Sequence, residues 1–339
     1  MKILFVKLGA IGDIIQAAAA LWQFRSENPD AHICWVAGKQ VVDLIHTTGI
    51  ANEVIEIDDK SLLVGTVFNR IIGLFKAITA LVKKGQYYDL IITAYTDWRY
   101  TLLSIGVLSR SRRRFIKHSS NFSINSGRNR TFEYWRLFSR SKFEKIDVRQ
   151  SMEAVGNAIL KNSSPDLLHY GLPNNYVILA PGGAKNMLRN DDLRRWPVDR
   201  YFQIAQKLSA IGKNVVIVGG IGDSWVSEKF QGLPVLDLVG LTSLFDLIHV
   251  MDRADLVITH DSGPLHLAAI THTSIIAIFG PTPPNAVISF ARPKTIVLHA
   301  ANRVACCPCY DGQNYALCSN AKCMDSITVD AVWGAIAKV

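Results

Sequence analysis

Short β-branched runs alternate with segments of helical periodicity along the whole chain, and this pattern constrains the fold more than any other feature. In the first half, the runs are ILFVK (3–7), HICWVAG (32–38), VIEID (54–58) and DLIIT (89–93), and each precedes a helix-like segment. Parallel strands joined by crossover helices have this spacing. The sequence therefore predicts an α/β fold whose first domain is doubly wound.

A stretch rich in Ser, Pro, Asn and Gly, NSSPDLLHYGLPNN (162–175), interrupts the pattern and is typical of a linker. A second series of strand-like runs follows it: YVILA, NVVIVGG, PVLDLVG, ADLVITH and SIIAIFG. With 339 residues, of which 49% are hydrophobic, two domains are expected. We predict an N-terminal domain over 1–165, a C-terminal domain over 166–325, and a helix within 326–339 that packs back on the N-terminal domain.

The loop KLGAIGD follows the first strand. Gly9 and Gly12 permit a tight turn and a close approach of backbone N–H groups to a ligand. The loop is not GxGxxG, so the dinucleotide fingerprint is absent. Asp13 lies at or just inside the predicted helix start, where a carboxylate either caps the helix, complements its dipole, or serves chemistry. Ligands in such chains bind at the carboxyl ends of strands, between domains.

Glycines and cations gather in the loop after YVILA. Gly182 and Gly183 are followed by Lys185 and, further along, by Arg194. Backbone N–H groups exposed by glycine, combined with nearby cations, favour a phosphate or diphosphate ligand. The alternative is an exposed basic loop.

Two more strand-end loops carry polar residues. Asp261 or Ser262 is predicted to cap a helix that begins near Gly263, and His266 lies one turn further along. In GGIGD, Asp223 follows another strand, where an acidic residue commonly binds ribose hydroxyls.

These motifs, KLGAIGD, PGG with RRWP, GGIGD, and HDSGPLHLAA with FGPTPP, resemble those of glycosyltransferase family 9, the ADP-heptose:lipopolysaccharide heptosyltransferases. The resemblance runs the length of the chain, in order and spacing. It implies a GT-B fold: two Rossmann-like doubly wound domains facing across a cleft, the N-terminal one binding the acceptor and the C-terminal one the nucleotide-sugar donor.

The resemblance also implies an activity, which is transfer of heptose from ADP-heptose to a lipopolysaccharide core with inversion at the anomeric carbon. It makes Asp13 the general base, and it places Arg194 at the leaving diphosphate. The implied donor-binding residues are Gly182, Gly183, Lys185, Asp223, Thr242, Asp261, Ser262, Gly263 and His266. The implied acceptor-binding residues are Gly9, Gly12 and Arg99.

No Asp-x-Asp pair of the kind that holds a divalent ion for sugar-nucleotide transfer occurs in the sequence. We therefore expect metal-independent catalysis, with cations and a helix N-terminus neutralising the leaving group.

The net charge of +9 resides entirely in residues 110–149, which hold twelve Lys and Arg against three carboxylates. Such a run is a solvated surface, a nucleic-acid site or an anionic membrane contact. Together with the resemblance, it favours an anionic glycan acceptor and peripheral contact with the inner membrane surface, with no nucleic acid. The start lacks a signal peptide's apolar region. No apolar run reaches the roughly 20 residues of a membrane span. The expected location is therefore the cytoplasm or the inner face of its membrane.

Five of the six cysteines cluster near the C-terminus. Cys306, Cys309, Cys318 and Cys323 give C-x2-C-x8-C-x4-C, a spacing that could hold structural zinc or iron or bind nothing.

Three alternative functions remain open from the sequence. A GT-B transferase could use another sugar nucleotide or acceptor. A nucleotide-sugar epimerase would share the phosphate loops but need no acceptor. A nucleic-acid-binding protein would use the basic segment and leave KLGAIGD and HDSGPLH without a purpose.

Overall fold

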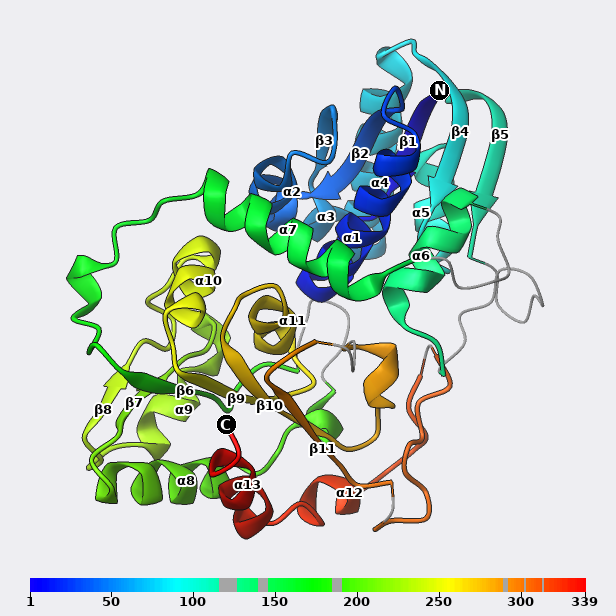
Figure 1. Ribbon diagram of the computed structural model, residues 1–339. Coiled ribbons are helices and arrows are strands. Elements are labelled where there is room, and N and C mark those ends of the chain that lie inside the picture. The colour runs from blue at the N-terminus through cyan, green and yellow to red at the C-terminus, as the bar shows by residue number, and fades with distance from the viewer. Residues whose placement is uncertain (116–126, 140–145, 185–190, 289–291, 302, 313) are drawn as a thin grey trace. The chain divides into compact units, whose positions relative to one another are not determined.

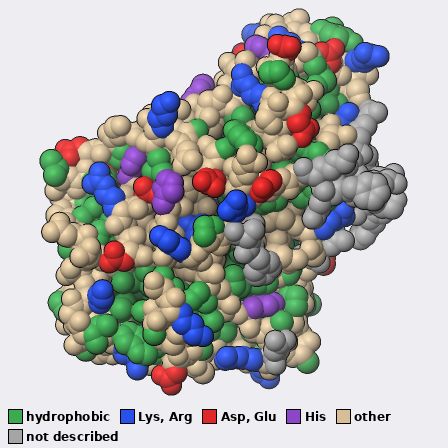
Figure 2. Space-filling model, in the orientation of Figure 1, with side chains coloured by type: hydrophobic (Ala, Val, Ile, Leu, Met, Phe, Trp, Pro, Cys, Tyr) green, Lys and Arg blue, Asp and Glu red, His purple; other side chains and the backbone are tan. Residues whose placement is uncertain are grey.

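The chain divides into two compact units, one ending at Asn162 and the other beginning at Ser163. The computed structural model describes residues 1–115, 127–139, 146–184, 191–288, 292–301, 303–312 and 314–339 (Figure 1). Each unit contains its own parallel β-sheet. Cationic and anionic side chains are interspersed over the face drawn in Figure 2.

The sheet of the first unit has the strand order β3-β2-β1-β4-β5, and every pair of neighbours is parallel. This order is that of a doubly wound sheet, in which the direction of winding reverses between β1 and β4. The loops that follow β1 and β4 therefore border the crevice in which such sheets bind ligands. The strands are β1 (Lys2–Val6), β2 (His32–Gly38), β3 (Glu53–Ile57), β4 (Tyr87–Thr93) and β5 (Leu108–Arg114).

Helices cover both faces of this sheet, because alternate side chains of a strand point to opposite faces. Leu4 and Val6 share a hydrophobic core with residues of α4 and α5, whereas the ring of Phe5 contacts Phe138 of α6. The helices are α1 (Ile11–Glu27), α2 (Val42–Thr48), α3 (Asp59–Leu63), α4 (Val67–Lys83), α5 (Trp98–Leu103), α6 (Arg130–Ser139) and α7 (Val148–Asn162), with a 3-10 turn, η1 (Lys39–Val41).

The sheet of the second unit repeats this winding with one more strand, in the order β11-β10-β9-β6-β7-β8, again all parallel. Its reversal lies between β6 and β9, so the loops after these two strands border its crevice. The strands are β6 (Tyr176–Ala180), β7 (Asn214–Ile217), β8 (Val235–Asp237), β9 (Leu256–His260), β10 (Ser274–Phe279) and β11 (Thr295–His299).

The helices of the second unit follow its strands in the chain. They are α8 (Val198–Ala210), α9 (Trp225–Lys229), α10 (Leu244–Asp252), α11 (Gly263–Ala269), α12 (Lys322–Asp325) and α13 (Val329–Ile336), with 3-10 turns η2 (Leu168–Tyr170), η3 (Asp192–Arg194), η4 (Ile221–Asp223) and η5 (Pro284–Ala286). Among the described residues, no helix has the length and apolar character needed to cross a membrane.

The C-terminal helix corrects one prediction. We expected residues 326–339 to pack back on the N-terminal domain, but the buried side chains of Val332 and Ala335 belong to the hydrophobic core of the second unit. The indole Nε1 of Trp196, at the entry to α8, donates a hydrogen bond to the carbonyl of Ile327 over 2.8 Å. The apolar face of α13 is thus buried against α8 and the sheet of its own unit.

Candidate active site

Asp13 lies in the first turn of α1, directly after the loop that leaves β1. The N-cap position is held by Ala10, with no side-chain capping hydrogen bond, so the Asp13 carboxylate does not cap the helix. Instead, its Oδ2 accepts a hydrogen bond from Lys7 Nζ over 2.9 Å, and its Oδ1 accepts one from the Tyr134 hydroxyl over 2.7 Å. A carboxylate at the switch point of the sheet is therefore held from two sides.

Lys7 is a buried cation at the end of β1, with only 1% of its side chain exposed. Its ammonium lies 4.7 Å from the ring centroid of Tyr95 and 5.8 Å from that of Tyr134. Burial lowers the pKa of Lys7, although the charge of Asp13 opposes this effect. A lysine directly after the apolar run ILFV was the feature of the sequence that could have identified Lys7 as a site residue. Neither Lys7 nor Tyr134 was among the predicted site residues.

The Asp13 carboxyl is strongly acidic. Burial raises its pKa, but the positive charges of Lys7 and Arg130, with the hydrogen bonds from Lys7 and Tyr134, outweigh burial and lower the pKa to about 2. The group is therefore ionised at neutral pH. It is able to accept a proton from a hydroxyl whose own acidity rises during reaction.

The two glycines of the loop differ in their surroundings. A Cβ added to Gly9 would meet no atom within 4 Å, so contacts within the protein do not require glycine at this position. Gly12 is buried within the first turn of α1. The open space at Gly9 is compatible with the predicted approach of an acceptor.

Arg99, predicted to bind an acceptor carboxylate, lies at the start of α5, in the loop region after β4. Its guanidinium pairs with Asp97, through Nε to Oδ1 at 3.0 Å and Nη2 to Oδ2 at 2.6 Å. The hydrogen bond to Asp97 raises the pKa of Arg99. An acceptor carboxylate would compete with Asp97 for this cation.

In the second unit, Asp223 joins two strand-end loops. Its Oδ1 accepts a hydrogen bond from the N–H of Gly183, and its Oδ2 accepts one from the N–H of Gly220, both over 2.9 Å. A Cβ on Gly182 would lie 2.4 Å from Asp223 Cγ, so this position requires glycine. Gly183 has a φ of 83°, which also favours glycine. Asp223 organises the loop, and its predicted ribose contact stays a prediction.

Arg194, the last residue of η3, forms an ion pair with the buried Asp261, which directly follows β9. Nη1 of Arg194 lies 3.4 Å from Asp261 Oδ2, and Nη2 lies 3.3 Å from Asp191 Oδ2. Thr282 donates a hydrogen bond to Asp261 Oδ2 over 2.6 Å and lies 3.1 Å from the Tyr315 hydroxyl. Burial raises the pKa of Asp261, but Arg194 and Thr282 outweigh it and the net shift is downward. Thr282 and Tyr315 were not predicted, because they lie in separate loops.

The remaining predicted donor residues also belong to the second unit. Ser262 occupies the N-cap position of α11, but its hydroxyl donates to the carbonyl of His260 over 3.2 Å, so the predicted side-chain cap is wrong. A Cβ on Gly183 would approach Ser262 Cβ to 3.1 Å, which brings the loops after β6 and β9 together. Gly263 and His266 lie on α11, and Thr242 lies just before α10. Lys185 lies outside the described residues.

The predicted cysteine site is not assembled in the described parts of the chain. There, the one group of three His, Cys, Asp or Glu residues with ligand atoms within 4.8 Å of one another is His32, Cys34 and Glu53. Cys306, Cys309, Cys318 and Cys323 do not form such a group. Instead, the Cys318 thiol donates to the carbonyl of Asn320 over 2.6 Å.

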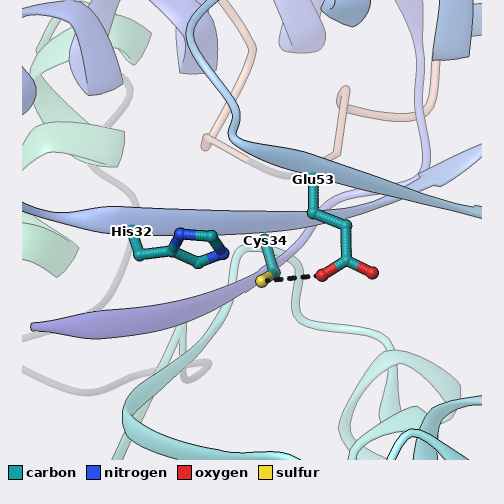
Figure 3. A group of neighbouring side chains, drawn as sticks. All are labelled: His32, Cys34 and Glu53. Atoms are coloured by element: carbon teal, nitrogen blue, oxygen red, sulfur yellow. Dashed lines mark hydrogen bonds between the residues drawn. The ribbon is translucent and has the colours of Figure 1, made fainter.

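The group of His32, Cys34 and Glu53 lies on β2 and β3, where Cys34 and Glu53 are partners in register (Figure 3). The Cys34 thiol donates to Glu53 Oε2 over 3.4 Å, and Lys84 forms an ion pair with Oε1. Burial and the neighbouring carboxylate raise the pKa of the Cys34 thiol to about 11. A protonated thiol and a lysine already satisfy Glu53, so this arrangement disfavours a metal ion. His32 and Glu53 are the first residues of their strands, so they lie at the end of the parallel sheet opposite to Asp13, which follows the carboxyl end of β1.

The sheet orders and strand-end loops are those of a two-domain Rossmann-like protein of the GT-B class, and comparisons with known proteins agree. The family model described as "Glycosyltransferase family 9 (heptosyltransferase)" matches residues 79–315. The chain is similar to lipopolysaccharide heptosyltransferase 3 of Escherichia coli, with 24% identity over 296 residues, which cover 80% of this chain and 81% of that protein.

Two solved structures share the fold. The family 9 glycosyl transferase of Veillonella parvula DSM 2008 matches with a TM-score of 0.72 and 19% identity, over 99% of this chain and 96% of that one. The E. coli heptosyltransferase WaaC with ADP matches with a TM-score of 0.71 and 17% identity, over 100% and 99%. The chain belongs to glycosyltransferase family 9, and the predicted family and GT-B fold are confirmed.

Proposed function

We propose that the protein transfers heptose from ADP-heptose to a lipopolysaccharide core acceptor, with inversion at the anomeric carbon and Asp13 as general base. The observation that carries this proposal is the ionised Asp13 carboxylate, fixed by Lys7 and Tyr134 at the switch point of the first sheet. The names of the relatives support the choice of donor and acceptor: one is a lipopolysaccharide heptosyltransferase, and a neighbour of the same fold is described with ADP.

In this mechanism, an acceptor hydroxyl attacks the anomeric carbon as the bond to the diphosphate breaks. The new C–O bond forms on the face opposite the leaving group, and the electron pair of the broken bond departs with ADP. The hydroxyl becomes acidic only as its bond to carbon forms, so a carboxylate with a pKa of about 2 accepts the proton late. Lys7 and Tyr134 keep the carboxylate oriented while this happens.

The leaving diphosphate gains negative charge as the sugar departs. We assign its stabilisation to Arg194. Arg194 is paired with Asp261 and Asp191 in this structure, so a diphosphate would share the cation with these carboxylates. The proposed chemistry uses these groups and requires no metal ion. Structural zinc or iron at the cysteines is not part of the proposal.

The test is transfer from ADP-heptose to heptose-deficient lipopolysaccharide in the presence of a chelator, comparing wild type with Asp13→Asn and Asp13→Ala. We expect both variants to fold and to lose transfer by at least ~100-fold. Turnover of a sugar nucleotide without any acceptor would favour an epimerase, and transfer only from another sugar nucleotide would change the donor. Unchanged transfer by Asp13→Asn would exclude Asp13 as the base.

The proposed acceptor is carried on a lipid, so we place the reaction at the inner face of the cytoplasmic membrane. We do not propose a nucleic-acid-binding function: in the described part of the basic segment, the guanidinium groups of Arg112 and Arg113 donate hydrogen bonds to backbone carbonyls of the protein itself.

A further inference from the structure

Helix α4 exposes large apolar side chains on its outer surface. Phe68, Ile71 and Phe75 are 71%, 61% and 69% exposed, and they recur at the spacing of one helical stripe. We call this stripe and its neighbours the α4 face, which comprises Val64, Val67, Phe68, Ile71, Ile72, Phe75 and Val82, all exposed.

The buried side of α4 explains why its large apolar side chains face outward. The buried positions are Gly73, Ala77 and Leu81, spaced four residues apart. A Cβ on Gly73 would lie 2.8 Å from Ser61 Oγ, so the helix packs closely on α3 through its smallest residues. The side of α4 that carries its larger apolar residues therefore points away from the core. Contiguous exposed apolar surface of this kind marks an interaction site.

Every charged residue of the segment that carries the α4 face is a cation. Residues 64–84 contain Arg70, Lys76, Lys83 and Lys84 and no carboxylate, and of these Lys84 is paired with Glu53 of β3. The apolar surface continues past the end of the helix. A Cβ added to Gly106 would lie 3.2 Å from Val82 Cγ2, and the nearby Ile105 and Leu108 are exposed. Further along β5, every second residue is an exposed arginine: Arg110, Arg112 and Arg114.

We propose that the α4 face docks on a phospholipid bilayer that contains anionic headgroups. Some helices have aromatic and aliphatic side chains on one side, lysine and arginine beside them, and no carboxylate of their own. Such a helix binds in the plane of a membrane interface. At 17 residues, α4 runs about 25 Å, and its apolar stripe would enter the boundary between headgroups and acyl chains. Anionic lipids complement its cations.

This inference rests on the exposed face alone and does not require the proposed heptosyl transfer. It also moves the predicted membrane contact from the basic segment 110–149 to α4, with the described arginines of β5 as an extension. A protein partner or a second copy of this chain would need to bring carboxylates to the same surface.

The test is flotation of the protein with vesicles of phosphatidylcholine alone or of phosphatidylcholine mixed with phosphatidylglycerol, whose headgroups give the surface a negative potential. Wild type is expected to float with the anionic vesicles and to stay behind with the neutral ones. Phe68→Ser/Phe75→Ser is expected to lower the partition coefficient at least ~10-fold. Lys76→Glu/Lys83→Glu should lower it to a similar extent, with a loss that depends on salt.

Matched controls use exposed residues of the second unit, Leu168→Ser/Leu317→Ser for the apolar pair and Lys213→Glu/Lys338→Glu for the charged pair. Both controls are expected to float as wild type does. Circular dichroism and thermal unfolding check that each variant folds. Hydrogen exchange with anionic vesicles should show new protection over residues 64–84.

Equal flotation of wild type and Phe68→Ser/Phe75→Ser would overturn the proposal, as would failure of wild type to bind anionic vesicles. Light scattering tests the alternative occupant. A wild-type dimer that Phe68→Ser/Phe75→Ser converts to a monomer, with vesicle binding unchanged, would assign the α4 face to a second copy. Vesicle binding and transfer are measured separately, so failure of one leaves the other standing.

Discussion

The hydroxyl of Tyr134 donates a hydrogen bond to Asp13 over 2.7 Å, although 121 residues separate them in the chain. Tyr134 lies on α6 and Asp13 on α1, and these two helices pack together on one face of the first sheet. The contact fixes the orientation of the carboxylate independently of the helix that carries it.

Tyr134→Phe removes this hydrogen bond and keeps the ring. Because the hydrogen bond helps to lower the pKa of Asp13, we expect that pKa to rise and kcat for heptosyl transfer to fall about 10-fold, with the donor KM unchanged. Tyr87→Phe, at an exposed tyrosine of the same unit, is the control. Wild-type kcat in Tyr134→Phe would remove Tyr134 from the site.

Lys7→Met removes a buried cation with little change in side-chain volume. With the pKa of Asp13 at about 2, wild-type kcat/KM should show no acid limb from this group between pH 8 and about pH 4. Loss of the Lys7 charge raises the pKa of Asp13, so the limb should move up into the measurable range. The measurement is the pH profile of kcat/KM, and an unshifted profile would contradict the role given to Lys7.

Gly182→Ala places a methyl group where Asp223 now lies, at 2.4 Å from Cγ. We expect the carboxylate to be displaced from the N–H groups of Gly183 and Gly220, and ADP affinity to fall at least ~10-fold by calorimetry, because the loop after β6 loses its anchor. Gly222→Ala is the control in the same region, since a Cβ there would meet nothing within 4 Å. Equal ADP affinity in the two variants would refute the anchoring role.

Arg194→Met leaves Asp261 without its main cation, whereas Arg194→Lys keeps the charge but not the two-sided contact with Asp191 and Asp261. We expect Arg194→Met to lower kcat at least ~100-fold and Arg194→Lys to retain part of the activity. Arg194→Met should also unfold at a lower temperature than Arg194→Lys, because it leaves the buried Asp261 carboxylate without a charge partner. Loss of stability without any loss of kcat in the folded fraction would make Arg194 purely structural.

His260 is fully buried, and its Nδ1 lies 3.0 Å from the Tyr201 hydroxyl. Burial, with the nearby Arg194, lowers its pKa from 6.5 to about 3. Below pH 6.5 the unfolded chain binds a proton that the folded protein does not, so stability falls as the pH decreases toward 3. Between pH 6.5 and 5.0 this loss is about 2 kcal/mol.

Urea unfolding at pH 6.5 and 5.0 measures this loss. His260→Asn should be less stable overall but lose less on acidification, whereas His46→Asn, at an exposed histidine, should behave as wild type does. An equal acid loss in His260→Asn would show that other groups control it.

The alternation of strands and helices, with glycine and carboxylate at strand ends, predicted the doubly wound sheets and the place of Asp13, because both depend on local sequence. The partners of Asp13 were not predictable in this way. Tyr134 reaches it only through packing of α6 on α1, and a local pattern does not specify which helices pack together. Asp223 was read as a ribose ligand, since the spacing revealed its strand-end position but not the two backbone N–H groups in front of it.

Helical periodicity identified α4 but not which of its sides faces the sheet. Apolar side chains normally point inward, and here the positions next to α3 hold glycine and alanine instead. The prediction for the C-terminal helix was wrong for a related reason. Its apolar residues predict that it is buried, but its short sequence does not indicate which unit it packs against.

The burial of Val332 and Ala335 in the core of the second unit limits how this enzyme can be recombined with its relatives. A chimera made to exchange the second unit must carry residues 163–336 as one piece. A crossover placed before α13 would join a foreign helix to this core, and mismatched side-chain volumes at those two positions would cost the hybrid its stability before substrate choice could be measured.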